Sequence, residues 1–143
     1  MGDRYDRSAW KVTPMSSKTP WGFEKQWSAL PGVNGKLLTI KEGHRTSLKY
    51  HKNKTEAFYI LAGKVKFEFA DEEWLHYKGI EMKTETLTAG QSVCVQSHCV
   101  YRIEALEESQ VIEIADAGDT YGGVVRIQDD YGRMTTDSKY PNL

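Results

Sequence analysis

The sequence predicts an all-β domain made of short antiparallel strands. From Lys36 onward, β-type runs follow one another and are separated by glycines or charged residues. In residues 64–69 apolar and charged side chains alternate strictly, which places Val65, Phe67 and Phe69 on one face of a half-buried strand. Few stretches carry a 3.6-residue apolar period long enough for a helix. Many short strands with regular turn signals are typical of a sandwich or closed barrel, and we expect a jelly-roll barrel.

The predicted strands begin after a polar N-terminal region. They cover residues 36–41, 45–51, 56–62, 64–70, 85–89, 92–96, 100–105 and 110–115. Gly63 separates the third run from the fourth, and a glycine there predicts a hairpin because it readily adopts a positive φ. Residues 71–83 have mixed polarity, and we expect an extended hairpin or excursion.

The length of 143 residues indicates one domain, which we divide into three parts. Residues 1–35 are polar, contain three prolines and are predicted to form an extended N-terminal arm. Residues 36–133 carry the strand pattern and form the barrel. Residues 134–143 form a polar C-terminal tail that we expect to be loosely attached.

Composition excludes several classes of protein. Lys and Arg total 19 against 20 Asp and Glu, and the basic residues are scattered, so a nucleic-acid-binding face is disfavoured. No apolar run is long enough for a membrane span, and the first ten residues lack the apolar segment of a signal peptide. We therefore expect a cytoplasmic protein. Cys94 and Cys99 do not match a disulfide scaffold or a zinc pattern and are expected to be reduced thiols.

A spaced set of glycine, histidine and glutamate lies between the second and fourth strands. Gly43, His51, Glu56 and Gly63 fall in register with the pattern G-x5-H-x-H-x(3,4)-E-x6-G, which resembles the first cupin motif. The second cupin motif, G-x5-P-x-G-x2-H-x3-N, is matched by Gly90. At its other positions the sequence has Gln96, His98, Tyr101 and Ala105. This resemblance implies a cupin double-stranded β-helix.

Three further segments resemble one particular family within the cupins. Residues 20–22 (Pro-Trp-Gly), 36–51 and 124–133 together are similar to type II mannose-6-phosphate isomerases, over about residues 18–133. In that family the isomerase is usually a C-terminal cupin domain preceded by a mannose-1-phosphate guanylyltransferase domain. The sequence has no counterpart of that second enzyme, so we do not expect nucleotide-sugar synthesis.

The resemblance also implies a metal site, and two of its ligand positions are substituted. The family's ligands would stand at positions 49, 51, 56 and 101, where this sequence has Lys49, His51, Glu56 and Tyr101. His51 and Glu56 are therefore the candidate metal ligands. Two ligands seldom hold a divalent ion against water, so we expect the metal to be absent or weakly bound.

The same four residues are the candidate catalytic groups of a sugar isomerase or epimerase. Positions 49 and 51 share a strand face, so Lys49 points where the metal would lie and is the expected partner of Glu56. With a metal, Lys49 would transfer the proton. Without one, His51 would act as base and Tyr101 as acid, and Lys49 would stabilise the oxyanion.

Two arginines are the candidate substrate-binding residues. Arg126 and Arg133 would by default be solvated or paired with Asp129 and Asp130. The family resemblance implies instead that one of them faces a sugar phosphate.

A non-catalytic protein is the alternative hypothesis. The substituted positions belong to the metal-holding part of the family pattern, whereas the framework glycines remain. A cupin that binds a carbohydrate or small molecule, or that has a structural role, would show the same pattern, because the fold does not decide the function. Lys49 distinguishes the two hypotheses, because a binding cavity has little need of a buried cation opposite a carboxylate.

We expect the protein to be a homodimer in solution, because the long arm and the exposed strand edges favour pairing between chains. Light scattering checks this expectation. A mass equal to a single 16.3 kDa chain would contradict it.

Overall fold

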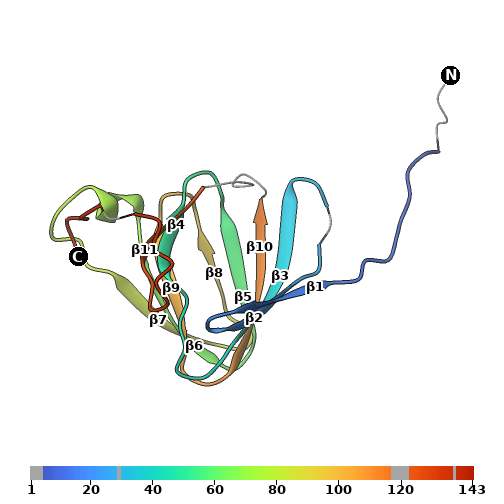
Figure 1. Ribbon diagram of the computed structural model, residues 1–143, viewed down its shortest axis with the longest axis horizontal. Coiled ribbons are helices and arrows are strands. Elements are labelled where there is room, and N and C mark those ends of the chain that lie inside the picture. Colours follow the sequence, from blue (N-terminus) through green and yellow to red (C-terminus); the bar gives the residue numbers. More distant parts are fainter. Residues whose placement is uncertain (1–4, 29, 117–122, 137) are drawn as a thin grey trace.

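Two antiparallel β-sheets face each other in the computed structural model (Figure 1), which describes residues 5–28, 30–116, 123–136 and 138–143. One sheet has the strand order β1-β2-β3-β10-β5-β8, and the other has the order β11-β4-β9-β6-β7. The strands are β1 (Met15–Thr19), β2 (Gly22–Gln26), β3 (Val33–Ile40), β4 (Leu48–His51), β5 (Glu56–Ala62), β6 (Lys64–Ala70), β7 (Lys83–Thr88), β8 (Ser92–Val95), β9 (Val100–Ala105), β10 (Ser109–Asp116) and β11 (Val124–Gln128). The predicted all-β jelly-roll barrel is confirmed.

Each of the eight predicted runs contains a strand, and the structure adds three more. Two of these, β1 and β2, lie within residues 1–35 and form a hairpin that pairs with β3. Trp21 in the turn of this hairpin is buried in the core. Residues 5–14 form no strand, remain exposed and extend away from the barrel (Figure 1).

The segment 71–83 is the second of the two expected forms, an excursion, and not a hairpin. A single 3-10 turn, η1 (Glu72–Leu75), follows β6, and an irregular stretch then leads into β7. Trp74 and Leu75 in this turn are buried in an apolar cluster with Leu48, Val100 and Ile127. The chain therefore folds inward at these two apolar residues instead of continuing as a strand pair.

The main core lies between the sheets and supports the cavity described below. Val65 and Phe67 are fully buried, so the predicted inward face of β6 is confirmed there, while Phe69 is half-buried. The Phe67 ring stacks on Tyr101, with ring centroids 5.8 Å apart, and the Phe58 ring packs against Tyr101 at 5.3 Å. These rings fix the position of Tyr101 at the centre of the barrel.

The C-terminal tail is fastened to the barrel, so the expectation of loose attachment is wrong. The Asn142 side chain donates hydrogen bonds to the carbonyls of Trp74 (2.8 Å) and Tyr77 (2.7 Å). It also accepts one from the backbone N–H of Ile80 at 3.0 Å. The Tyr140 ring stacks on Trp74. The tail thus satisfies the backbone groups of the irregular segment after η1.

Two of the remaining expectations concern thiols and membranes. Cys94 and Cys99 are free, the first exposed and the second half-buried. Among the described residues, no helix is long and apolar enough to span a bilayer.

Gly63 forms the predicted turn, with φ at +90°, but the predicted hairpin is wrong, because β5 and β6 lie in different sheets and do not pair. The turn carries the chain from one sheet to the other, and it gives a stability test. A Cβ at Gly63 would lie 2.3 Å from Ser109 Oγ and 2.5 Å from the Glu108 carbonyl oxygen. At Gly79, with a similar φ of +83°, a Cβ would meet nothing within 4 Å. We expect Gly79→Ala to cost about 1–2 kcal/mol from backbone strain alone, and Gly63→Ala to cost about 1–3 kcal/mol more from the steric contact.

Urea unfolding of the two variants beside the wild type measures this difference. Equal losses of stability would show that the contact of the added Cβ at position 63 with Ser109 costs no stability.

Candidate functional site

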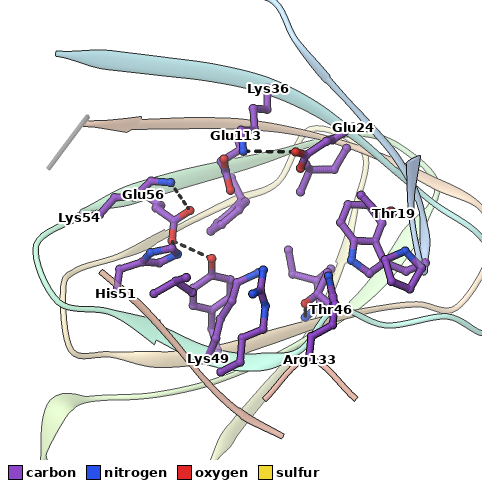
Figure 2. A pocket seen from close by; sticks show the side chains of 18 of the residues that line it. Thr19, Glu24, Lys36, Thr46, Lys49, His51, Lys54, Glu56, Glu113 and Arg133 are labelled. Carbon is purple, nitrogen blue, oxygen red and sulfur yellow. Dashed lines mark hydrogen bonds and ion pairs between the residues drawn. The ribbon is translucent and has the colours of Figure 1, made fainter. Parts of the chain in front are cut away.

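A cavity of about 480 Å³ opens between the two sheets. Ionisable side chains from eight strands line it (Figure 2). Six of them come from β4, β5, β9, β10 and β11: Lys49 and His51 from β4, Glu56 from β5, Tyr101 from β9, Glu113 from β10 and Arg126 from β11. The cavity therefore gathers all four predicted catalytic residues, and it places beside them Glu113, which the sequence did not single out.

Strand register brings these side chains together. Lys49 pairs with Tyr101 on β9 and with Arg126 on β11, so the three side chains lie in one row across the sheet. His51 lies two residues further along β4 and points to the same face. The alternation predicted for positions 49 and 51 is thus the reason that both reach the cavity.

Glu56 is the centre of the hydrogen-bonded cluster. Its side chain is 2% exposed, and its Oε1 accepts a hydrogen bond from the Tyr101 hydroxyl at 2.7 Å. His51 Nε2 lies 3.2 Å from the same oxygen. One carboxyl oxygen therefore contacts both a phenol and an imidazole.

The expected pairing of Lys49 with Glu56 is not the contact observed. The cation nearest to Glu56 is Lys54, whose Nζ lies 3.9 Å from Oε2, too far for a hydrogen bond. Lys49 Nζ lies instead 5.4 Å from the centre of the Tyr101 ring. Lys49 stands directly opposite Tyr101 in the sheet, so its side chain runs over that ring, whereas Lys54 approaches Glu56 from the loop before β5.

Burial shifts the protonation of Glu56 and His51 in opposite directions. Burial, reinforced by the negative charge of Glu113, raises the pKa of Glu56 to about 8. Burial, reinforced by the charges of Lys54 and Lys49, lowers the pKa of His51 to about 3. Near neutral pH, Glu56 therefore holds its proton for most of the time and His51 is neutral.

The pKa values of Tyr101 and Lys49 are also shifted. Burial, followed by the charge of Glu56, raises the pKa of Tyr101 well above its usual value, so the phenol stays protonated. Burial lowers the pKa of Lys49, while the carboxyl groups of Glu56 and Glu113 oppose that shift.

Glu113 is the site residue that the sequence reasoning missed. It lies on β10 opposite Phe58, whereas Glu56 lies opposite Ala115, so the two carboxyl groups are diagonal neighbours on the inner face. Glu113 is 7% exposed. A signal was present, because Val111, Glu113 and Ala115 share one face of the run 110–115 and a charged residue interrupts an otherwise apolar face.

The two predicted substrate-binding arginines both line the cavity, in different states. Arg133 forms the default ion pair with Asp129, with Nη2 to Oδ1 at 3.0 Å. Arg126 Nε is buried and has no hydrogen-bond partner among the described residues. Asp130 pairs with Arg45 at 2.7 Å. Arg126 is therefore the arginine with hydrogen-bonding capacity left for a ligand.

The donor set does not fit a divalent metal. Tyr101 donates its proton to Glu56, and Lys49 offers an ammonium group where the family pattern has a ligand. Nowhere in the part of the chain that the structure describes do three His, Cys, Asp or Glu side chains gather at metal-binding distance. His51 and Glu56, the two candidate ligands, contact each other instead. These residues are suited to proton transfer by side chains and not to holding a metal ion.

Comparison with known proteins shows the fold class. No protein-family model and no curated protein sequence matches the chain. Among solved structures it is similar to KdgF from Halomonas sp., with a TM-score of 0.60 and 16% identity over 73% of this chain and 87% of that chain. It is also similar to CapF in complex with 3-isopropenyl-tropolone, with a TM-score of 0.66 and 14% identity over 82% of this chain. Oxalate decarboxylase from Bacillus subtilis gives a TM-score of 0.64 and 15% identity over 87% of this chain.

These similarities confirm the cupin fold. The neighbours are cupin-fold proteins, and the chain has the same fold, a double-stranded β-helix. It spans 35% of the CapF chain and 34% of the oxalate decarboxylase chain. At such low sequence identity these neighbours establish the fold of the chain and not its activity. The resemblance to mannose-6-phosphate isomerases is not among the similarities that they show.

The raised pKa of Glu56 gives a test of this geometry. Because the folded pKa is about 8 and the unfolded value about 4.5, the contribution of Glu56 to stability is fully present below pH 4.5. It is lost as the pH rises through about 8. Glu56→Gln cannot ionise, so we expect the variant to gain stability relative to the wild type by a few kcal/mol between about pH 5 and pH 9.

Urea unfolding across this pH range measures the effect. Glu42→Gln is the matched control, because Glu42 is exposed. A difference between Glu56→Gln and the wild type that does not change with pH would contradict the raised pKa.

Proposed function

We propose that this cupin-fold chain isomerises or epimerises a sugar phosphate or a related sugar by proton transfer, without a metal. One observation carries the proposal. A buried carboxyl group, Glu56, contacts both a phenol and a neutral imidazole at the wall of a cavity of about 480 Å³. Sugar isomerisation needs an acid and a base that act on adjacent atoms, and such a pair supplies both.

The proton balance follows from the two protonation states. Neutral His51 takes the proton from the carbon next to the substrate carbonyl, while protonated Glu56 gives its proton to the carbonyl oxygen. The product is an enediol. When His51 returns its proton to the former carbonyl carbon, the other hydroxyl of the enediol gives its proton to Glu56, and the product is the isomer. When water protonates the opposite face of the original carbon, His51 gives its proton to water and the new hydroxyl returns its proton to Glu56, and the product is the epimer. No oxidant or reductant is consumed.

An anionic substrate would raise the pKa of His51 and so make it a stronger base. The cations Lys54 and Lys49 help to hold the pKa of His51 low. A bound anion offsets their charge, so His51 becomes a stronger base when the substrate is present. The base is thus activated by the ligand on which it acts.

Tyr101 and Lys49 act around this pair. The Tyr101 hydroxyl donates to Glu56, so in this proposal it orients the carboxyl group, which takes the role of acid that the sequence assigned to the phenol. Lys49 lies over the Tyr101 ring and supplies positive charge to the oxygen of the enediolate.

The charge of the cavity supports an anionic substrate. The basic side chains Lys18, Lys36, Lys49, Lys54, Arg126 and Arg133 line it, against Glu24, Glu56 and Glu113. Lys49 and Arg126 stand directly opposite each other on adjacent strands, where like charges are destabilising. A phosphate or carboxylate between them would offset this repulsion and would satisfy Arg126 Nε.

We expect turnover of mannose 6-phosphate or a related phosphosugar, measured by proton exchange with deuterium oxide and by NMR of the products. His51→Ala and Glu56→Gln should each lower kcat by about 10²–10⁴-fold, because each removes an acid–base group. Arg126→Met should raise KM and leave kcat nearly unchanged, because it removes binding common to the ground and transition states. His76→Ala, at an exposed histidine, is the control.

Two outcomes separate this proposal from its alternative. A rise in melting temperature with phosphosugars but no exchange and no turnover would favour a non-catalytic carbohydrate-binding cupin. Neither effect across phosphosugars and nucleotide sugars would reject the sugar-phosphate assignment.

A further inference from the structure

We propose that Glu113 forms a hydroxyl-binding subsite that selects polyhydroxy ligands. In this proposal its carboxylate accepts hydrogen bonds from ligand hydroxyl groups, next to the acid–base pair of Glu56 and His51. The proposed function supplies only the choice of an anionic sugar as probe.

The first support is a buried oxygen that lacks a partner. The Glu113 side chain is only 7% exposed, and its Oε2 accepts no hydrogen bond from an N–H or hydroxyl group of the described residues; the protonated carboxyl group of Glu56 is its one neighbour that can donate. Leaving a buried acceptor unsatisfied costs about 1–3 kcal/mol, and more for a charged group. Buried polar groups in native proteins are nearly always satisfied, so an exception points to a missing water or ligand.

The second support is the direction of the side chain. Glu113 lies on the inner face of β10 between Val111 and Ala115, and it lines the cavity. Figure 2 shows its carboxyl group pointing into the cavity, between Glu56 and the ion pair of Glu24 with Lys36. A ligand that fills the cavity would therefore meet this carboxylate.

The cations nearby are engaged elsewhere. Lys36 Nζ lies 3.5 Å from Glu24, and Lys54 Nζ lies 3.9 Å from Glu56. Within the described ranges, no Lys or Arg nitrogen comes within 4 Å of the Glu113 carboxylate. Glu113 is thus not held in an internal ion pair, and its acceptor capacity is open to donors in the cavity.

A neighbouring carboxyl group gives the competing explanation. Glu56 can donate a hydrogen bond to Glu113 while Glu56 carries a proton. That contact would use one of about four acceptor positions of the Glu113 carboxylate and leave the others unfilled. If proton sharing with Glu56 were the only role of Glu113, its substitution would change the pH dependence without changing the selectivity for hydroxyl groups.

Two chemical features together define the ligand class. Arg126 Nε, a buried donor without a partner, requires an acceptor such as a phosphate or carboxylate oxygen. Glu113 Oε2 requires a donor. A small molecule that offers both an anionic group and hydroxyl donors is a phosphorylated or acidic sugar, whereas a dicarboxylate or an apolar acid lacks the hydroxyl groups.

A double-mutant cycle between protein and ligand tests the subsite. Calorimetry on the full chain at pH 7 measures the Kd of inorganic phosphate, mannose 6-phosphate and its monodeoxy analogues, for the wild type and Glu113→Gln. We expect at least one monodeoxy analogue to bind the wild type about 10- to 100-fold more weakly than the parent sugar, as for a hydrogen bond to a charged group. In Glu113→Gln this penalty should largely disappear, and the Kd of inorganic phosphate should stay unchanged.

Glu42→Gln is the control, because it makes the same change at an exposed glutamate that does not line the cavity. It should keep the wild-type penalties. Circular dichroism and thermal unfolding verify the fold of each variant. If Glu113→Gln does not fold, Glu113→Asp keeps the charge and withdraws it by one methylene, and it should reduce the same penalty.

Three results would overturn the subsite. Equal deoxy penalties in the wild type and in the Glu113 variant would leave proton sharing with Glu56 as the role of Glu113. Mannose 6-phosphate that binds no more tightly than inorganic phosphate would show that the hydroxyl groups contribute nothing, and absence of binding by every probe would reject the ligand class. Coupled binding without turnover would uphold the subsite and reject the proposed isomerase activity, so the two failures are distinguishable.

Discussion

The buried carboxyl group of Glu56 constrains the rest of the site. A carboxyl group that is 2% exposed requires partners, and Tyr101 and His51 provide them at 2.7 and 3.2 Å from one oxygen. These partners come from β9 and β4 in one sheet, whereas Glu56 comes from β5 in the other. The contact therefore ties the two sheets together at the cavity. It also explains why burial shifts the pKa values of Glu56 and His51 in opposite directions, since each group is more easily buried in its neutral form.

Lys49 and Tyr101 occupy two ligand positions of the pattern that the sequence resembles, and they determine which chemistry this geometry can perform. Tyr101 gives its proton to Glu56, and Lys49 places a cation over the Tyr101 ring. The remaining acid and base contact each other, and positive charge is supplied by side chains around the cavity. Such an arrangement retains charge stabilisation and proton transfer, the two requirements of sugar isomerisation. The cupin barrel is thus compatible with this change of mechanism, since the fold itself does not fix the chemistry.

Sequence reasoning succeeded where a local pattern determined the outcome. Strict alternation located the strands, Gly63 located a turn, and the motif placed His51 and Glu56 together. The hairpin expected at Gly63 failed, because β5 and β6 pair with other strands in different sheets. It failed where the outcome depended on pairing between distant segments. The β1–β2 hairpin has a mostly exposed or half-buried polar pattern, so no apolar alternation marked it. Asn142 fastens the tail through backbone carbonyls that no side-chain pattern reveals. The partner of Glu56 depended on which lysine the loop before β5 brings near, and that lysine is Lys54.

The β1–β2 hairpin connects the N-terminal region to the cavity, and in the proposed function this places it beside the ligand. Lys18, Thr19 and Glu24 from this hairpin line the cavity, and Glu24 pairs with Lys36 on β3. Figure 2 places Thr19 and Glu24 away from His51, so the cavity has a proton-transfer end built by β4, β5 and β9 and another end walled by the hairpin. Glu113 lies between these regions. The two ends have different requirements. At the proton-transfer end, Glu56 and His51 must stay buried to keep their shifted pKa values, whereas the hairpin end must only match the shape and charge of a ligand. In the proposed function, substitutions in β1 and β2 would therefore act on the fit of the ligand and leave the Glu56 cluster intact.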